Sequence, residues 1–257
     1  MDGAKAWRIT GTLALVLVML AAGVQTWSLV MQQQTSATKP YDVVIHQVRL
    51  ETGSASVRLR AGREGHVVVK QRLDWMLRKP VVSATFAGDV LTVGMHCRQV
   101  LPFSDFGCGA EIELEVPAAT EVTGSVSSGS VSVEGLNGSV RMQLTSGQLS
   151  LAHTSGELWA ETTSGQVLAT DLSAQRVTAR TTSGSLELHF TRAPHAVDAR
   201  ATSGAVIMTV PKNSRYAFSS DVGSGSGGID PALEDSTSPD SIHAQVTSGS
   251  LTVGPSS

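Results

Sequence analysis

The chain has 257 residues, enough for one sizeable β domain, and its formal net charge is −3. This charge, with no basic stripe along the chain, excludes nucleic-acid binding driven by electrostatics. Aromatic residues make up only 4% of the chain, whereas glycine, serine, threonine and valine abound, which favours β structure over a helical core.

The first distinctive segment is apolar. No charged residue occurs between Ile9 and Thr38, and residues 11–31 are long enough to cross a bilayer as a helix, at about 1.5 Å per residue against a hydrocarbon core of about 30 Å. Lys5 and Arg8 precede this segment. The positive-inside rule therefore places residues 1–10 in the cytoplasm as a short tail, and the chain after the segment outside.

A cleaved signal peptide is the alternative interpretation of the same segment. Leu13 to Leu20 would form its hydrophobic region, and Ala21-Ala22-Gly23 would supply the cleavage site. The apolar run continues beyond this point to Met31, which favours an uncleaved anchor. Under both interpretations the rest of the chain is extracytoplasmic, and we expect a single-pass protein of the cell membrane.

Polar residues without apolar period follow at 32–40, which predicts a short linker. Apolar side chains then alternate with charged ones at 57–60 and 111–116, and period two is typical of strands. Residues 73–80 are predicted to be a loop or short turn. The whole of 41–257 is expected to be one extracytoplasmic β-repeat domain.

The two cysteines, Cys97 and Cys108, flank a loop that contains proline and glycine. In an oxidising compartment they are expected to form a disulfide. A disulfide around so short a loop contributes about 2–3 kcal/mol in the chain-entropy model. The alternative is a metal pair with His96, but no fourth ligand lies at motif spacing.

An internal repeat occupies the second half of the chain. Its signature is Ser/Thr-Ser-Gly, with Leu-Asn-Gly as one variant, and the spacing is nine residues at first and 18–20 residues later, where degenerate copies fill the gaps. The glycines that end these motifs are Gly129, Gly138, Gly147, Gly156, Gly165, Gly184, Gly204 and Gly249. Each of them is predicted to lie in a turn, where glycine supplies a positive φ or a close backbone approach.

A fixed pattern of polar, apolar, any, apolar follows each glycine. The apolar pairs are Val131/Val133, Val140/Met142, Leu149/Leu151, Leu158/Ala160, Val167/Ala169, Val177/Ala179, Leu186/Leu188, Val206/Met208 and Leu251/Val253. Positions two apart lie on the same face of a strand. Each unit is therefore predicted to be a short strand with two inward side chains.

One such unit cannot bury its own apolar pair, but stacked units can line a common interior. Two nine-residue strands per coil account for the period of 18–20 residues. The predicted fold is all-β, a β-solenoid or β-roll of stacked repeats with aligned Thr-Ser-Gly corners. Residues 221–240 interrupt the period and are expected to form a mobile surface loop before a last strand, Ala244 to Val253.

The membrane segment, the cysteine-containing hairpin before Pro117 and the tandem Ser-Gly-x-Val-x-Val units together resemble the DUF4097 family of bacterial β-strand-repeat proteins, also described as putative adhesins. The resemblance covers residues 41–253, most closely 122–210. It implies an extracytoplasmic β-repeat domain and an adhesin-like role, and relatives include proteins linked to cell-envelope stress responses. It supplies no catalytic residues.

Side chains suited to chemistry are few. Repeated calcium binding needs an aspartate in every unit, and the repeats lack one. The carboxylates that a β-helix carbohydrate enzyme would need, with His153 near them in sequence, are Glu157, Glu161, Asp171 and Glu187. No second carboxylate column stacks beside them at coil spacing, and Gly-x-Ser-x-Gly at 223–227 lies in a low-complexity run rather than at a strand–helix elbow. We expect no catalytic residue, no cofactor and no metal.

The expected function is that of a non-catalytic, membrane-anchored, adhesin-like protein. Its partner would be an envelope glycan or an envelope protein, because aligned hydroxyl side chains on a rod present a flat polar surface. The alternative is a sensory or regulatory protein of the envelope-stress response. Since the cytoplasmic tail is too short for an output domain, this alternative would act through a membrane partner.

Overall fold

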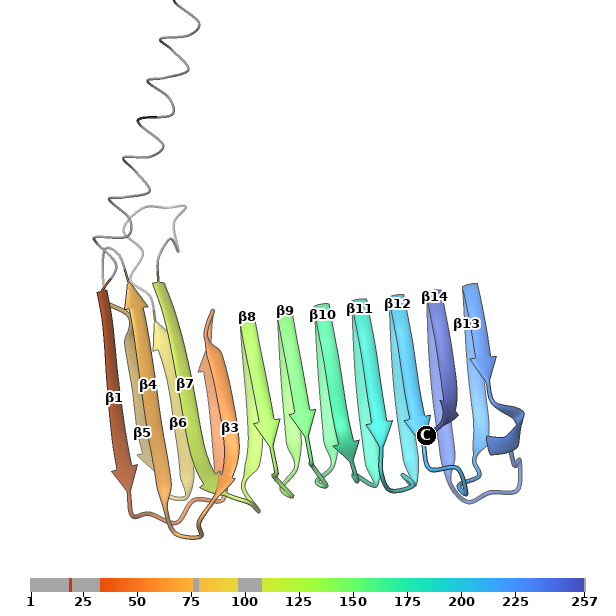
Figure 1. Cartoon of the computed structure of the whole chain (residues 1–257), viewed down its shortest axis with the longest axis horizontal. Helices are drawn as coiled ribbons and strands as arrows, with labels where there is room; N and C mark the ends of the chain where they lie inside the picture. Colours follow the sequence, from red (N-terminus) through yellow and green to blue (C-terminus); the bar gives the residue numbers. More distant parts are fainter. Residues whose placement is uncertain (1–18, 20–32, 76–78, 97–107, 257) are drawn as a thin grey trace, which may run out of the picture.

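The computed structural model describes residues 19, 33–75, 79–96 and 108–256. These residues form fourteen strands in one sheet whose neighbours are mostly parallel (Figure 1), with one short 3₁₀-helix, η1 (Pro231–Leu233). The expectation of an all-β fold is confirmed. Within this part of the chain no helix is long and apolar enough to cross a membrane, and the predicted segment 11–31, apart from Met19, lies outside it.

Six strands form the part that we call the regular stack. They are β8 (Glu121–Glu134), β9 (Val140–Ala152), β10 (Leu158–Leu172), β11 (Arg176–Phe190), β12 (Ala196–Val210) and β14 (Ser241–Pro255). Neighbours are parallel and shifted by one repeat: Val140 lies opposite Leu158, which lies opposite Val177. The stacking of repeats with like positions aligned therefore follows the predicted period.

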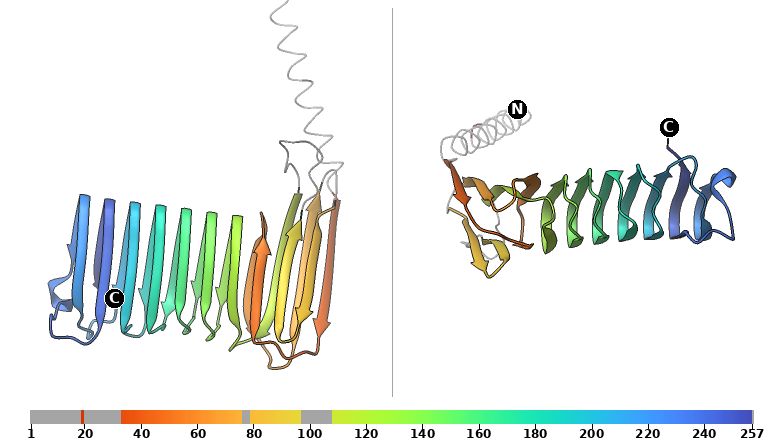
Figure 2. Two further views of the ribbon diagram at one scale, coloured as in Figure 1. Left: turned by 180° about the vertical axis from the view of Figure 1, so that it is seen from behind. Right: turned by 90° about the horizontal axis from the view of Figure 1, so that it is seen from below.

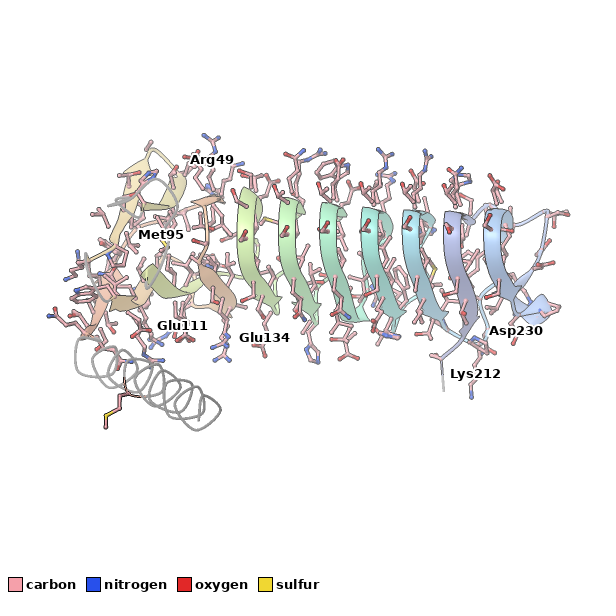
Figure 3. The ribbon with its side chains drawn as sticks, turned by 90° about the horizontal axis from the view of Figure 1, so that it is seen from above. Arg49, Met95, Glu111, Glu134, Lys212 and Asp230 are labelled. Atoms are coloured by element: carbon pink, nitrogen blue, oxygen red, sulfur yellow. The ribbon has the colours of Figure 1, made fainter. Side chains whose placement is uncertain are left out.

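Each of these strands bends at its Ser-Gly step. Only residues 153–157 connect the end of β9 to the start of β10, although β9 has 13 residues. An extended chain spans at most about 3.6 Å per residue, so this connection cannot return along a straight strand of that length. Burial switches phase at the step, since Leu144 and Leu149 are both buried. Each strand thus has a first arm, a corner and a second arm, which together we call a coil (Figure 3).

The core lies between the two arms of every coil. All the apolar pairs predicted to point inward are buried, so this prediction is confirmed. Several of these positions hold alanine, including Ala160, Ala179 and Ala199, each at most 1% exposed. Small inward side chains allow the two arms to approach closely, and such a core needs few aromatic residues.

The order of the strands in the sheet departs from their order in the chain at both ends. The arms β2 (Gln47–Thr52) and β3 (Ser56–Gly62) form a coil that lies between β8 and the arms β6 (Val90–His96) and β7 (Cys108–Pro117). At the other end, β14 lies between β12 and β13 (Ala217–Ile229). A parallel ladder accepts these insertions because every coil offers the same backbone hydrogen-bonding pattern.

Three antiparallel strands complete the part that we call the N-terminal region, β1 to β7. They are β1 (Gln33–Tyr41), β4 (Val67–Trp75) and β5 (Val81–Ala87). The residues predicted as a linker therefore form β1, and part of the predicted loop at 73–80 belongs to β4, where Leu73 is buried. β1 lacks apolar period because it is an edge strand that pairs through its backbone.

The prediction of a mobile surface loop at 221–240 is wrong over its first half. Residues up to Ile229 belong to β13, where Val222 lies opposite Val246 and Gly225 opposite Gly249. Glycines occupy much of this strand and leave no apolar pattern, but its backbone still pairs with β14. Leu233 of η1 is fully buried beyond β13, so the second half of the segment covers the end of the core.

Candidate functional site

Most of the predicted turn glycines form one column along the corners of the coils. Gly129, Gly147, Gly165, Gly184, Gly204 and Gly249 lie opposite one another in consecutive coils. Their φ angles are positive, for example +144° at Gly184, where an added Cβ would lie 1.8 Å from the carbonyl oxygen of Gly165. Both the backbone angle and the contact therefore demand glycine.

The other two predicted turn glycines, Gly138 and Gly156, belong to a second column between coils. An added Cβ at Gly156 would lie 1.9 Å from the carbonyl oxygen of Gly138, and one at Gly138 would lie 2.2 Å from that of Thr120. The nine-residue spacing of the sequence thus alternates between two sites of one coil. In the second column close backbone approach, rather than φ, is what requires glycine.

Hydroxyl side chains form rows beside the corner glycines. The outward residues just before the serine of each corner are Ser127, Thr145, Thr163, Thr182, Thr202 and Thr247, and all of them are exposed. These rows run across the whole regular stack in register. The structure therefore presents a continuous polar edge at the corners.

The face made by the first arms carries the most varied side chains. A shallow hollow crosses β9, β10 and β11 and is lined by Ser139, Val140, Arg141, Glu157, Leu158, Trp159, Arg176 and Thr178. The guanidinium carbon of Arg141 lies 4.8 Å from the centre of the Trp159 ring, in the range of a cation–π contact. Arg176 Nη1 donates to Glu157 Oε1 at 2.7 Å.

A second shallow hollow lies beside the first on the same face. It crosses β8, β9 and β10 and is lined by Ser125, Val126, Ser127, Gln143, Leu144, Thr145, Glu161 and Thr163. The two hollows share β9 and β10, since Glu161 follows Trp159 at the next outward position of β10. Together they make a polar strip with a single aromatic side chain among its lining residues.

An ion-pair cluster continues this face beyond β11. Arg180 Nη2 lies 3.2 Å from Asp198 Oδ2, and Arg200 Nε lies 2.8 Å from Asp198 Oδ1. Partial burial favours the neutral form of Asp198, but the hydrogen bonds from Arg200 and Arg180 outweigh it and lower the pKa of this carboxyl. The cluster therefore stays charged and fixes its arginines.

The opposite, second-arm face of the N-terminal region carries alternating charges (Figure 3). Glu111, Glu113 and Glu115 of β7 lie between the basic side chains of β3 and β4, which are Arg58, Arg60, Lys70 and Arg72. A hydrogen bond to Glu115 is the main reason why the pKa of Lys70 is raised. A shallow hollow here is lined in part by Ser36 and Thr38 of β1. Glu134 of β8, 3.1 Å from Arg60, completes the balance of charges, so this charge lattice offers little to a charged partner.

The carboxylates considered as catalytic candidates do not converge. Glu157 pairs with Arg176 as described, Asp171 Oδ2 lies 3.3 Å from His153 Nε2, and Glu187 Oε1 accepts from Gln166 Nε2 at 2.8 Å. Among the described residues no group of three or more metal-ligating side chains comes together. Each of these three carboxylates has a neighbouring polar partner instead of facing a second acid.

The predicted disulfide is only partly within the described residues. Cys108 begins β7, whereas Cys97 lies outside them. Sequence reasoning had not singled out Trp159, Arg141 or Arg176. The signal that would have found them is the repeat itself, because a spacing of 18 residues places Arg141 beside Trp159 in the next coil.

The chain resembles a known family in sequence and a few solved structures in fold. A family model described as Toastrack DUF4097 matches residues 109–254, and no curated protein matches the chain. Among solved structures, a putative cell adhesion protein from Clostridium sporogenes is 12% identical with a TM-score of 0.40, covering 87% of this chain and 100% of its own. A putative adhesin from Bacteroides fragilis is 14% identical with a TM-score of 0.40, covering 86% and 97%.

A third solved structure is a putative lipid binding protein from Parabacteroides distasonis, 12% identical with a TM-score of 0.29, covering 87% of this chain and 97% of its own. These likenesses are distant. The family match, in contrast, spans more than half of the sequence and includes most of β7 and the entire regular stack up to residue 254. The chain belongs to the Toastrack DUF4097 family.

Proposed function

We propose that this protein is a membrane-anchored, extracytoplasmic, adhesin-like β-solenoid that binds envelope material without chemical turnover. The proposal rests on the continuous outward surface of the regular stack, where an exposed hydroxyl side chain recurs at the corner of every coil. Repeated equal contacts suit a polymeric partner, because each additional contact adds to the avidity of the whole surface.

The position of the apolar segment supports anchoring at one end of the sheet. The segment 11–31 ends just before β1, which begins at Gln33. β1 lies at one end of the sheet and β13 at the other (Figure 2). A helix in the membrane would therefore tether the protein at the β1 end of the sheet.

The pairing of the carboxylates supports a binding role over catalysis. General acid–base catalysis on a glycosidic bond needs two carboxyl groups that face each other across the substrate. Here Glu157 is held by Arg176 and Glu187 by Gln166, each on the coil beside it. Each of these carboxylates thus has a polar partner where a second catalytic acid would be needed.

The topology can be tested with a membrane-impermeant reagent that modifies lysine side chains, applied to wall-stripped cells that express the full chain. Lys70 and Lys212 should be modified in intact cells, whereas Lys5 should react only after lysis, as read by peptide mass spectrometry. Labelling of Lys5 together with protection of Lys212 would contradict the proposed orientation. A cytoplasmic protein of the same cells serves as the control for leakage.

The binding role can be tested by retaining the solubilised full chain on a support and passing over it the envelope fraction of the producing organism. Retention of glycan or of cell-wall polymer supports the adhesin-like function. Retention of one membrane protein alone, together with a changed envelope-stress response after gene deletion, would replace it by the sensory alternative. Retention of nothing would contradict binding to envelope material.

A further inference from the structure

Among the described coils, Trp159 is the one tryptophan, tyrosine or phenylalanine in its row of outward residues. The other members of the row, which lie in register with Trp159, are Thr92, Arg49, Thr123, Arg141, Thr178, Asp198, His243 and Ser219. Arg49 is the member of this row that is labelled in Figure 3. Every other member is polar or charged, so the indole interrupts an otherwise hydrophilic surface.

The core of β10 does not require this indole. Its neighbours Leu158 and Ala160 point inward and are 3% and 1% exposed, and they fill the interior of the coil. Trp159 is only partly buried on the outside. Water-exposed indole surface is unfavourable by itself, because removing apolar area from water lowers the free energy. An aromatic residue in this position therefore suggests a ligand.

The Trp159 ring has different neighbours on its two sides. Arg141 of β9 lies over the ring with its guanidinium carbon 4.8 Å from the centre. Towards β11 the neighbour in the row is Thr178, whose side chain is short. Close by, Glu157 and Arg176 hold each other at 2.7 Å. The hollow thus combines an aromatic platform with a carboxylate acceptor and guanidinium donors at its solvent-exposed rim.

A pyranose sugar fits this combination. Its axial C–H groups form an apolar patch that stacks on the electron-rich face of an aromatic ring, and its hydroxyls bond to planar guanidinium groups and carboxylates around the rim. We propose that the hollow around Trp159 binds a pyranose unit of an envelope glycan. This inference rests on the proposed function and specifies the class of its ligand.

The second hollow extends the site to a further sugar unit. Glu161 follows Trp159 at the next outward position of β10, and Gln143 and Thr163 line the same hollow. These side chains provide acceptors and donors without apolar area. A glycan chain would then cross β8 to β11 diagonally, with one unit stacked on the indole and the next held by hydrogen bonds.

Other partners fit the strip less well. Nucleic-acid bases also stack on tryptophan, but Glu157 and Glu161 balance the charges of Arg141 and Arg176 in the strip. With a net charge of −3 for the chain, no excess positive charge attracts a phosphate backbone. An apolar peptide or a lipid chain would need a continuous apolar patch. The aligned neighbours of Trp159 are Arg141 and Thr178, so the apolar area is confined to one ring.

The test compares the full chain in detergent with three variants, using chitohexaose and soluble glycan strands from the organism's own cell wall as probes in titration calorimetry. Trp159→Ala should weaken binding of the recognised glycan about tenfold or more, which corresponds to about 1.4 kcal/mol. Trp159→Phe keeps a smaller ring and should lose less. His243→Ala, in the same row on β14, is the matched control and should bind like the parent chain.

Thermal unfolding of each variant, followed by circular dichroism, distinguishes a lost contact from a lost fold. Selective loss in Trp159→Ala, with His243→Ala unchanged, supports the site. Equal binding by Trp159→Ala and the parent chain would overturn it, although the chain would still bind glycan. Failure to bind either glycan probe, while the envelope fraction yields another retained cell-wall polymer, would overturn the inference and leave the proposed binding function intact.

Discussion

In the regular stack every strand pair is parallel and shifted by one repeat, whereas the N-terminal region pairs β1 with β4, β4 with β7 and β5 with β6 in antiparallel fashion. The stack repeats one corner, with glycine at each aligned position and hydroxyl side chains beside it. The N-terminal region has unlike strands, and cross-strand ion pairs connect β3, β7 and β4. Within one sheet, the order of the strands is therefore favoured in two ways: by the repeated corner in the regular stack and by cross-strand ion pairs in the N-terminal region.

This difference shows that the repeated corner explains the stacking of coils in chain order but not the placement of the β2–β3 coil. Identical coils stack in order because each corner fits on the one before it, and this fit depends on backbone atoms. The coil of β2 and β3 lies out of chain order, between β6–β7 and β8. Opposite charges on β3 and β7, and again on β7 and β4, favour this order, because like charges in adjacent strands repel.

The largest expected effect concerns the corner of the regular stack. Gly184→Ala would place a Cβ 1.8 Å from the carbonyl oxygen of Gly165, at a φ of +144° that alanine rarely adopts. Since the obstacle is backbone, which cannot move without breaking the ladder, we expect a loss of about 3 kcal/mol or more in the free energy of unfolding. Urea unfolding followed by circular dichroism measures it.

Gly228→Ala is the matched control for this substitution. Gly228 lies in β13, at the end of the sheet, and an added Cβ would meet no described atom within 4 Å. Its φ lies outside the left-handed range. The change should therefore be neutral or slightly stabilising, within about 0.5 kcal/mol, because alanine loses less backbone entropy on folding. Equal destabilisation by both alanines would show that the corner column has no special role.

The same comparison explains which parts of the fold were predictable from the sequence. The inward pairs of the regular stack were predictable because apolar period two and the returning glycine both reflect local geometry. β13 was not, because Gly227 and Gly228 stand opposite Leu251 and Thr252 and leave no side-chain pattern. β1 was missed for a similar reason, since this polar edge strand pairs with β4 through its backbone and contacts the core through Tyr41 at its end.

The candidate site was less predictable than the fold. The alternation of β10 predicts that Trp159 points outward, but an isolated outward tryptophan has no partner in sequence. Arg141 becomes its neighbour only through the register of β9 and β10, and Arg176 reaches Glu157 through that of β10 and β11. The insertion of β14 between β12 and β13 was also unpredictable, because like coils offer equivalent ladders.

A smaller effect of opposite sign is expected inside the regular stack. Thr181 is 4% exposed, and its Oγ1 has no hydrogen-bond partner among the described residues. The aligned position holds Thr162 in the preceding coil and apolar residues, Ala201 and Val246, in the following coils. Thr181→Val keeps the shape and removes the unpaired hydroxyl, so the free energy of unfolding should rise by about 1 kcal/mol. The melting temperature reports this gain.

The neighbouring residue provides the control for that prediction. Thr182 is exposed at the corner row, where its hydroxyl is free to bond water. Thr182→Val should leave the melting temperature nearly unchanged, within about 0.5 kcal/mol of stability. If Thr181→Val destabilises the protein instead, the buried hydroxyl has a hydrogen-bond partner, such as an ordered water. The hydroxyl would then contribute to the stability of this coil.

The smallest effect is expected in the charge lattice of the N-terminal region. Glu113 Oε1 lies 3.6 Å from Lys70 Nζ and 3.8 Å from Arg60 Nη1, with 26% of its side chain exposed. Glu113→Gln keeps the size and removes the charge, so the loss should stay below about 1 kcal/mol at low salt. It should shrink in 1 M salt, where the screening length is about 3 Å.

Charge reversal makes this last test decisive for strand order. Glu113→Lys places a cation between Arg60 and Lys70 and should destabilise more than Glu113→Gln, again in a salt-dependent way. Glu121→Lys on β8 serves as the control, since Glu121 is exposed at the start of a first arm. A salt-independent loss at position 113 would mean that packing, rather than charge, selects β7 as the neighbour of β3 and β4. Side-chain and backbone packing would then determine the strand order in both regions.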